Sequence, residues 1–208
     1  DGFLIASTLE NYSEMNEIVP EGLPVVLVDR LLAGAPYDTI TVANYQAVSS
    51  SVEYLIKRGH KKIGFITGIP RISTTAERLE AYRDTMEKYD LLKDSLICTG
   101  TSMTSLVTEN LDALLKQGCT ALVISNNLMA IEALTILSRR KIRSEIELVG
   151  YKDSEQSQYG LQHMNLICQP VVELGRAAGR QLLERLKNPN MPVQKVLLQA
   201  EFQPAEEL

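Results

Sequence analysis

Residues 55–68 read Leu55-Ile56-Lys57-Arg58-Gly59-His60-Lys61-Lys62-Ile63-Gly64-Phe65-Ile66-Thr67-Gly68, and this segment indicates the fold class. Upstream of it, apolar residues recur at helical spacing and predict a helix from Asn44 to Arg58. Gly59 is placed to end this helix in the left-handed conformation. The run Ile63–Thr67 is continuous and rich in large apolar residues, which is typical of a strand buried on both faces of a parallel sheet. The stretch is therefore a helix-to-strand connection of an α/β protein.

The same alternation continues in both directions. Further short apolar runs predict strands at Phe3–Ala6, Val25–Val28, Leu96–Cys98, Ala121–Ser125, Leu148–Tyr151, Leu166–Cys168 and Val196–Leu198. Amphipathic stretches between them predict helices over residues 75–89, 104–117, 127–140 and 171–187. Strands that alternate with helices form right-handed crossovers and doubly wound parallel sheets, so the predicted fold class is α/β.

The composition is that of an ordinary globular protein, with 45% hydrophobic and 23% charged residues in a chain of 208. The net charge is −5, and basic clusters are limited to short pieces such as Arg139-Arg140-Lys141. Because a surface that grips nucleic acid needs clustered Lys and Arg, we expect this segment not to bind DNA by itself. No stretch is long and apolar enough to span a bilayer. The three cysteines have no paired spacing, which fits a reducing cytoplasm.

The sequence contains little that could support catalysis. His60 and His163 are its two histidines, and His60 is expected to pack at a helix end. The turn Gly68-Ile69-Pro70 lacks the G-K-[S/T] ending of a phosphate loop, and no G-x-G-x-x-G follows a strand. We find no nucleophile–base pair and no metal-ligand cluster, and we predict a protein without enzymatic activity, cofactor or metal.

Polar turns follow the apolar strands. Ligands of doubly wound sheets bind beyond the carboxyl ends of the strands, so these turns are where we expect the ligand site. The candidate ligand-binding residues are Ser7, Asp29, Thr74, Thr101, Asn126, Lys152 and Asp153, together with Arg78 in the first turns of the following helix. The planar fork of Arg78 suits a carboxylate, a phosphate or a vicinal diol, and its alternative role is a structural pair with Glu77 or Asp153.

The sequence resembles the LacI/GalR family of transcription regulators. The matching segments occur in family order at Asp1–Ile5, Pro24–Arg30, Asn44-Tyr45 with Leu55–Gly68, Arg78–Tyr82, Ala121–Ala130, Leu148–Asp153 and Gln169–Ala178. The resemblance covers essentially the whole chain. It implies two Rossmann-like lobes with parallel sheets, of the periplasmic-binding-protein type, joined by crossing segments near residues 40–43, 165–169 and 189–193. The first lobe would comprise residues 1–40 plus 169–190, and the second 41–165 plus 193–208.

The resemblance also implies a function. A small polar effector, either a sugar or a phosphorylated or acidic sugar, would bind between the lobes and control the binding of operator DNA by a homodimer, with the 127–140 helix in the dimer contact. The family's helix-turn-helix headpiece and the opening part of its sensor domain are expected to be absent, which would leave the first lobe incomplete with an exposed sheet edge. Two alternatives stay open: a periplasmic sugar-binding transport receptor of the same fold, and a sensor that answers to a partner protein.

Several candidate residues match positions that the family uses. Arg78 matches its effector-binding arginine, and Asp29 matches a position that accepts hydrogen bonds from ligand hydroxyls; the alternative for Asp29 is an ion pair with Arg30 or Arg78. Asn126 is a candidate ligand contact, and Asn127 is expected to cap the helix that begins there. Tyr12, Tyr37 and Tyr159 are candidates for aromatic residues at the mouth of the cleft, or are ordinary loop tyrosines.

Two positions depart from the family pattern. Lys152 stands where the family usually has Asp, and Ala43 stands where it often has Asp. Lysine offers three donors and no acceptor, so a neutral sugar would lose an anchor. Either the effector is negatively charged and is held by Lys152 together with Arg78, or Lys152 turns outward or pairs with Asp29 or Asp153.

Overall fold

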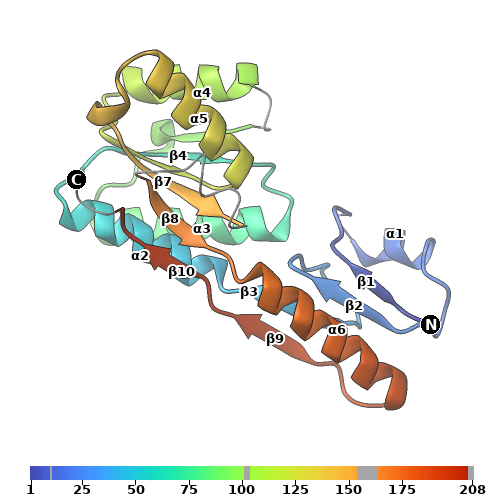
Figure 1. The fold of residues 1–208 in the computed structure, drawn as a ribbon. Helices are drawn as coiled ribbons and strands as arrows, with labels where there is room; N and C mark the ends of the chain where they lie inside the picture. Colours follow the sequence, from blue (N-terminus) through green and yellow to red (C-terminus); the bar gives the residue numbers. More distant parts are fainter. Residues whose placement is uncertain (10, 101–103, 154–163, 206–208) are drawn as a thin grey trace. The chain divides into compact units, whose positions relative to one another are not determined.

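A computed structural model of the chain describes residues 1–9, 11–100, 104–153 and 164–205. The chain divides into two compact units, each with its own sheet (Figure 1). Unit 1 consists of Asp1–Ala43, Arg71–Thr74 and Pro170–Gln199, and unit 2 of Asn44–Pro70, Thr75–Gln169 and Ala200–Leu208. Both units are discontinuous in sequence, so each is completed by residues from distant parts of the chain.

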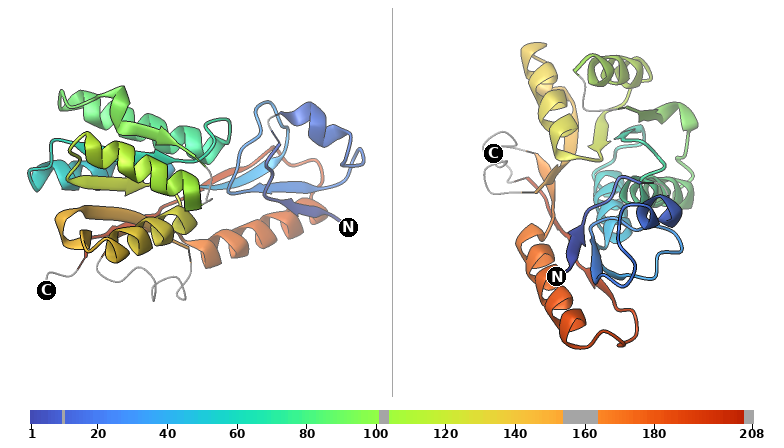
Figure 2. Two further views of the ribbon diagram at one scale, coloured as in Figure 1. Left: turned by 90° about the horizontal axis from the view of Figure 1, so that it is seen from above. Right: turned by 90° about the vertical axis from the view of Figure 1, so that its right-hand side faces the viewer.

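The sheet of unit 1 is parallel. Its strands are β1 (Phe3–Ile5), β2 (Val25–Val28), β3 (Asp38–Val42) and β9 (Lys195–Leu198), and they lie in the order β1-β2-β3-β9. Two helices, α1 (Tyr12–Asn16) and α6 (Val171–Lys187), lie on opposite sides of this sheet (Figure 2). The apolar side of α6 packs through Ala178 against Val26 and Ile40. Met15 and Val19 pack with Leu27 on the other face.

Strand β1 is an edge strand of unit 1. Among the described residues it pairs with β2 alone. The side chains of Phe3 and Leu4 are each 47% exposed. Native proteins rarely expose unpaired strand edges with apolar side chains, because such edges can pair with a strand of another chain.

The sheet of unit 2 is larger and mostly parallel. Its strand order is β10-β8-β7-β6-β4-β5, with β10 (Glu201–Gln203) antiparallel to β8 (Asn165–Cys168). The remaining strands are β7 (Glu147–Lys152), β6 (Ala121–Ile124), β4 (Ile63–Thr67) and β5 (Ile97–Thr99). The helices are α2 (Asn44–Lys57), α3 (Ser73–Lys88), α4 (Thr104–Lys116) and α5 (Asn127–Arg139), with 3₁₀ turns η1 (Asp94–Leu96) and η2 (Arg143–Glu145).

Helices cover both faces of the unit 2 sheet. Residues of α2 and α3, such as Leu55 and Tyr82, pack against Phe65 on one face. Residues of α4 and α5, such as Leu111 and Leu137, pack in a second cluster on the other face. The strands are buried on both sides, as their continuous apolar runs predict. The predicted fold class, α/β with parallel sheets, is confirmed.

The structure differs from the sequence-based prediction in the strands and in the bounds of the two lobes. The crossing expected near residues 40–43 falls where the chain passes from unit 1 to unit 2, between Ala43 and Asn44. The strand that leads up to it, β3 (Asp38–Val42), was not predicted, because its Asp and Thr residues distinguish it from the continuous apolar runs. Residues 193–208 were assigned to the second lobe, whereas β9 pairs with β3 inside unit 1 and β10 pairs with β8 inside unit 2. The short strand β10 was not predicted.

His60 lies where the sequence placed it, just beyond the end of α2. Its Nδ1 is 2.8 Å from the hydroxyl of Thr120, and its Nε2 is 2.8 Å from a carboxylate oxygen of Glu147. Although burial opposes it, hydrogen bonds from His60, Arg58 and Asn165 lower the pKa of Glu147. This cluster lies at the amino end of β7 and ties α2 to the sheet.

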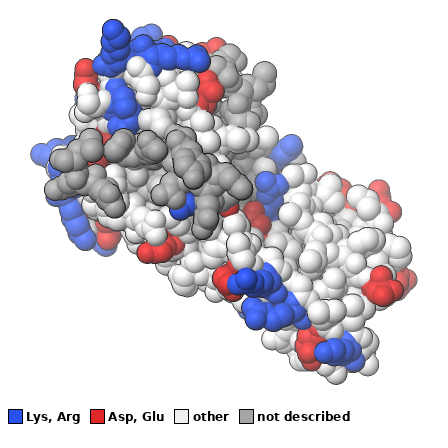
Figure 3. Space-filling view, viewed as in Figure 1, with Lys and Arg blue, Asp and Glu red and all other residues white. Residues whose placement is uncertain are grey.

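Two surface properties bear on function. None of the described helices is both long and apolar enough to cross a bilayer. On the face shown in Figure 3, Lys and Arg groups are interspersed with Asp and Glu groups. Such mixed charge differs from the clustered basic surface that phosphate backbones require.

Candidate functional site

Polar groups gather at the carboxyl ends of strands β6 and β7 in unit 2. Ser125 and Asn126 follow β6, and Lys152 and Asp153 end or follow β7. Helix α3 contributes Arg78 to the same edge, because this side chain reaches the carbonyl of Ser125. The sequence-based expectation that these turns come together is met within unit 2.

Arg78 is the best-anchored member of this group. It is only 8% exposed, its Nε donates to Oδ1 of Asn44 at 2.8 Å, and its Nη1 donates to the carbonyl of Ser125 at 2.6 Å. The guanidinium carbon lies 4.1 Å from the centroid of the Tyr151 ring. A guanidinium over an aromatic face gains a cation–π attraction, which grows when water is excluded.

These contacts use Nε and Nη1 of the Arg78 guanidinium but not Nη2. Nη2 of Arg78 makes no hydrogen bond with any residue that the structure describes. Glu77, a partner considered for Arg78, accepts instead from Nδ2 of Asn44 at 3.1 Å. This carboxylate therefore orients Asn44, which in turn holds Arg78. The arrangement presents a fixed cation whose outer N–H groups can serve an acceptor.

The start of α5 corrects one prediction. Asn126, not Asn127, is the N-cap: its Oδ1 accepts from the backbone N–H of Met129 at 2.9 Å. Asn127 already lies inside the helix, and its Nδ2 donates to Asp153 Oδ1 at 2.7 Å. Asn126 takes the cap position because it has the extended backbone that an N-cap needs. The pair Asn127–Asp153 joins the turns after β6 and β7.

Lys152 is the last residue of β7 and is half-buried. It pairs in register with Cys168 of β8. Burial raises the pKa of the Cys168 thiol, and the Lys152 charge acts in the opposite direction. Lys152 immediately precedes Asp153, so both residues lie at the carboxyl end of β7, beside the Asn127–Asp153 pair.

Unit 1 has a polar carboxyl edge of its own. Asp29 directly follows β2 and has a φ of 67°, a left-handed conformation that is uncommon for residues other than glycine. The N–H of Arg30 donates to the carbonyl of Val28 at 2.8 Å, which closes a three-residue γ-turn around Asp29. Strained turns of this kind concentrate at functional sites.

The neighbours of Asp29 hold this turn. Its carboxylate is 3.9 Å from Nε of Arg30, a long contact for an ion pair, and the side chain is 31% exposed. Nη1 of Arg30 reaches the carbonyl of Ser7 at 3.5 Å, and the hydroxyl of Ser7 accepts from the N–H of Leu9. Of the two partners considered for Asp29, Arg30 is thus present at the limit of ion-pair distance.

Helix α3 begins in the short segment of unit 1 that spans Arg71–Thr74. The hydroxyl of Ser73 accepts from the N–H of Leu31 at 2.9 Å, and Thr74 is buried.

Thr101 and Tyr159 fall outside the described residues. Asn44 and Tyr151, which support Arg78, were not predicted from the sequence. A polar residue at the start of a buried helix face was the available signal for Asn44.

Tyr12 and Tyr37, considered for the mouth of a cleft, lie elsewhere in unit 1. Their ring centroids are 5.5 Å apart, and the rings meet edge to face. They belong to a hollow at the amino ends of β2 and β3, at the opposite end of the sheet from Asp29.

The chain is similar to curated bacterial transcription regulators. It is 31% identical to the probable HTH-type transcriptional regulator EndR of Paenibacillus polymyxa over 195 residues, which cover 89% of this chain and 56% of that protein. It is 28% identical to the ribose operon repressor of Haemophilus influenzae, covering 85% of this chain and 55% of the repressor. The chain thus spans about half the length of the curated relatives it matches.

Solved structures share the fold. The transcriptional regulator CelR in complex with cellobiose superposes with a TM-score of 0.85 at 23% identity, covering 98% of this chain and 64% of CelR. The expected resemblance to LacI/GalR regulators is confirmed by the curated relatives, and the CelR structure shows the shared fold. The model of the periplasmic binding protein-like domain matches residues 52–204. Because that match covers more than half of the sequence, the chain belongs to the periplasmic binding protein-like domain family.

Proposed function

We propose that the chain is the ligand-sensing core of a bacterial transcription regulator. The proposal rests on the geometry of Arg78: Asn44, Ser125 and Tyr151 fix it at the carboxyl edge of the unit 2 sheet, and its Nη2 makes no hydrogen bond with a described residue. Arginines held in this way are pre-organised for a bidentate acceptor. The names of the relatives, HTH-type regulator and operon repressor, support regulation over a transport receptor.

The ligand is a small polar effector, either a sugar or a phosphorylated or acidic sugar. In unit 2 its contacts are Arg78, Asn126, Lys152 and Asp153. Nδ2 of Asn126 remains available after the cap is made, since the cap uses only Oδ1. In unit 1 the proposed contacts are Ser7, Asp29 and Thr74, with Thr101 as a further contact outside the described residues.

The protein acts by coupling and not by catalysis. A ligand that prefers one arrangement of the sensor stabilises that arrangement by the difference in its two affinities, typically about 1–3 kcal/mol. In the longer protein this difference would alter the affinity of a helix-turn-helix segment for operator DNA. We further propose a homodimer, with α5 in the subunit contact, and a cytoplasmic location where the DNA is found.

A thermal-shift screen tests the ligand class. The panel contains cellobiose, ribose, sugar phosphates and sugar acids, and it is run on wild type, Arg78→Gln and Lys152→Asp. A ligand present at 100 times its dissociation constant stabilises the folded state by about 2.7 kcal/mol, which a melting curve resolves. Arg83→Gln is the matched control, because Arg83 lies on the same helix but pairs with Asp94 on the surface.

We expect at least one class to raise the melting temperature of wild type and of Arg83→Gln, and to lose this effect in Arg78→Gln. If only sugar phosphates or acids act, and Lys152→Asp abolishes their effect, the effector is anionic. If neutral sugars raise the melting temperature and Lys152→Asp increases that rise, the effector is neutral. A ligand whose effect survives in Arg78→Gln would refute the proposed site.

A further inference from the structure

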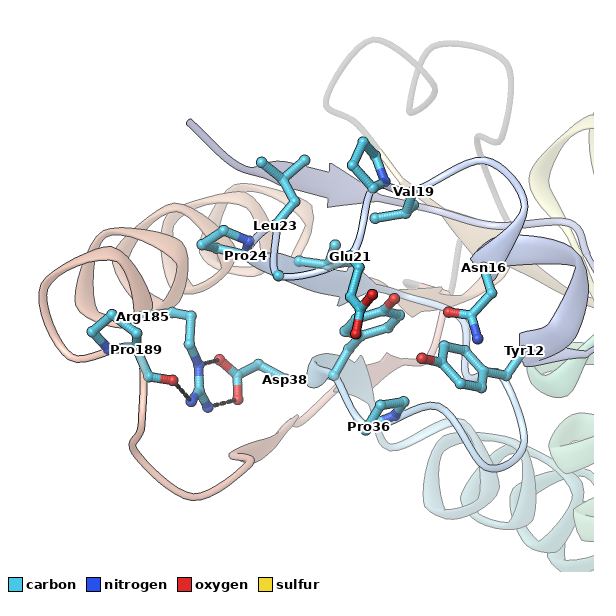
Figure 4. Close-up of a pocket in the computed structure, with 14 residues that line it drawn as sticks. Tyr12, Asn16, Val19, Glu21, Leu23, Pro24, Pro36, Asp38, Arg185 and Pro189 are labelled. Carbon is cyan, nitrogen blue, oxygen red and sulfur yellow. Dashed lines mark hydrogen bonds and ion pairs between the residues drawn. The ribbon is translucent and has the colours of Figure 1, made fainter.

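The hollow that contains Tyr12 and Tyr37 lies in unit 1 at the amino ends of β2 and β3. Its volume is about 660 Å³, within the usual range of small-molecule sites. Val25 and Asp38, the first residues of β2 and β3, line it, and Asp29 follows the other end of β2. The hollow therefore lies at the opposite end of β2 from Asp29, and Figure 4 shows the residues that line it.

The cation that lines the described wall of this hollow, Arg185, has no donor to spare. Its Nε and Nη2 donate to the two carboxylate oxygens of Asp38 at 3.0 and 2.6 Å. Its other N–H groups donate to the carbonyls of Pro189, Met191 and Pro192. A guanidinium has five N–H donors, and all five are used. An anion entering the hollow would therefore find no positive partner.

The carboxylate of Asp38 adds no net charge to the hollow, because Arg185 neutralises it. Its side chain is fully buried, and it also accepts from Gln181 Nε2 at 3.0 Å and from the N–H of Gln194 at 2.8 Å. Burial raises the pKa of Asp38, but hydrogen bonds from Arg185, Gln181 and Gln194 outweigh it and lower the pKa. Asp38 is ionised and neutralised by Arg185, so the pair acts as a rigid wall.

Glu21 supplies the uncompensated charge. It is exposed, and its carboxylate has no ion pair or hydrogen bond with any described residue. In Figure 4 this carboxylate points into the hollow, and the hydroxyl of Tyr12 points to the same space. An ionised carboxylate is an acceptor only. It therefore selects ligands that carry donors, and positively charged donors most strongly.

The aromatic pair beside Glu21 favours the same kind of ligand. The rings of Tyr12 and Tyr37 meet at 77° with centroids 5.5 Å apart. Burial, followed by the hydrogen bond with Tyr12, raises the pKa of Tyr37 to about 12, so its hydroxyl stays neutral at ordinary pH. The faces of tyrosine rings are electron-rich and attract cations.

We propose that this hollow is a binding site for an alkyl guanidinium group, with Glu21 as its counter-ion and the Tyr12–Tyr37 pair as its aromatic surface. A guanidinium fits better than an ammonium because its planar fork pairs with a carboxylate through two parallel hydrogen bonds and also lies flat on aromatic rings. The group belongs to a free small molecule or to an arginine side chain of a partner protein. The site is independent of the proposed effector site.

An NMR titration of the folded chain with butylguanidinium tests the site, with uncharged butylurea as the shape-matched control ligand. We expect backbone signals of Asn16, Glu21 and Tyr37 to shift with butylguanidinium and not with butylurea. Glu21→Gln should weaken binding by about fivefold or more, the loss of one exposed charge contact. Glu17→Gln, an equal change of charge at an exposed residue outside the hollow, should leave the affinity unchanged.

Equal shifts with butylurea, equal weakening in Glu17→Gln, or shifts confined to other residues would overturn the proposal. A second arm uses the capped peptide acetyl-Gly-Arg-Gly-amide. Binding at least tenfold tighter than butylguanidinium would identify an arginine of a partner protein as the source. Equal or weaker binding would identify a free ligand, since flanking peptide groups would then add nothing. The outcome of the effector screen does not affect either result.

Discussion

The guanidinium of Arg78 stacks on the ring of Tyr151 at 4.1 Å, so a residue of α3 is seated on the end of β7. Both partners are almost completely buried. The contact couples the position of the candidate ligand-binding arginine to the packing of the unit 2 core. Changes at Arg78 should therefore affect stability as well as ligand affinity.

We expect Arg78→Lys to lower the free energy of unfolding by about 1–3 kcal/mol, since lysine cannot donate to Asn44 and to the carbonyl of Ser125 in the same geometry. Urea unfolding measures the change. Arg83→Lys should cost less than about 1 kcal/mol, because its partner Asp94 is exposed. Equal losses in the two variants would show that Arg78 is not specially anchored.

The helix cap gives a second prediction. Asn126→Ala should destabilise the protein by about 1 kcal/mol through loss of the bond to Met129, whereas Asn126→Asp should retain the cap. Asn127→Asp, in contrast, places a carboxylate against Asp153 and should destabilise at neutral pH. Thermal denaturation of the three variants distinguishes these roles. If Asn126→Ala were as stable as the wild type, the cap assignment would fail.

The glycine of β7 provides a packing test. A Cβ on Gly150 would lie 2.8 Å from Ala130 Cβ and 2.9 Å from Met164 Cε, so Gly150→Ala should cost about 1–3 kcal/mol. Gly175 lies within α6 with nothing inside 4 Å of such an atom. Gly175→Ala should accordingly stabilise by about 0.5–1 kcal/mol, the gain in helix propensity. Chemical denaturation of the two single variants supplies the comparison, and a stable Gly150→Ala would refute the packing.

The buried pair Asp38–Arg185 predicts a pH dependence. Asp38→Asn leaves a largely buried arginine without its charge partner and should cost about 3 kcal/mol or more at pH 7. Because the folded pKa of Asp38 is lowered, its contribution is complete above the ordinary aspartate range near 3.9 and is lost as pH falls through the lower folded value. The difference between wild type and variant should thus shrink in acid.

Unfolding free energies measured from neutral to acidic pH test this sign. Glu173→Gln is the control, since Glu173 and Arg176 form an exposed pair that contributes little at any pH. A gap between wild type and Asp38→Asn that widened as pH fell would contradict the assignment.

The sequence predicted the regular elements well where periodicity was strong. The five long helices and the apolar strands occur where expected, because burial on both faces leaves continuous runs such as Ile63–Thr67. Strand β3 was missed because Asp38 serves a buried ion pair whose partner, Arg185, is distant in sequence. No local pattern shows that such a residue can be buried.

The site was predicted in part. The carboxyl-end rule correctly placed Asn126 and Asp153 at one edge of unit 2, where Arg78, proposed from its chemistry and from the family resemblance, also lies. It could not reveal that Asn44 and Tyr151 support Arg78, or that the cap shifts by one residue, because these depend on side-chain packing between elements. Contact of Asp29, Ser7, Thr74 and Lys152 with a ligand stays a prediction.

The pairing of Ile40 with Val196 has a consequence for synthesis on the ribosome. Strand β9 leaves the exit tunnel only after strands β4 to β8 and helices α2 to α5 of unit 2 have emerged, so the sheet of unit 1 waits with β3 unpaired on one side. Nascent chains that stall before residue 195 would display this edge to neighbouring chains. Synthesis of β9 therefore covers a strand edge of unit 1 that could otherwise pair with another chain.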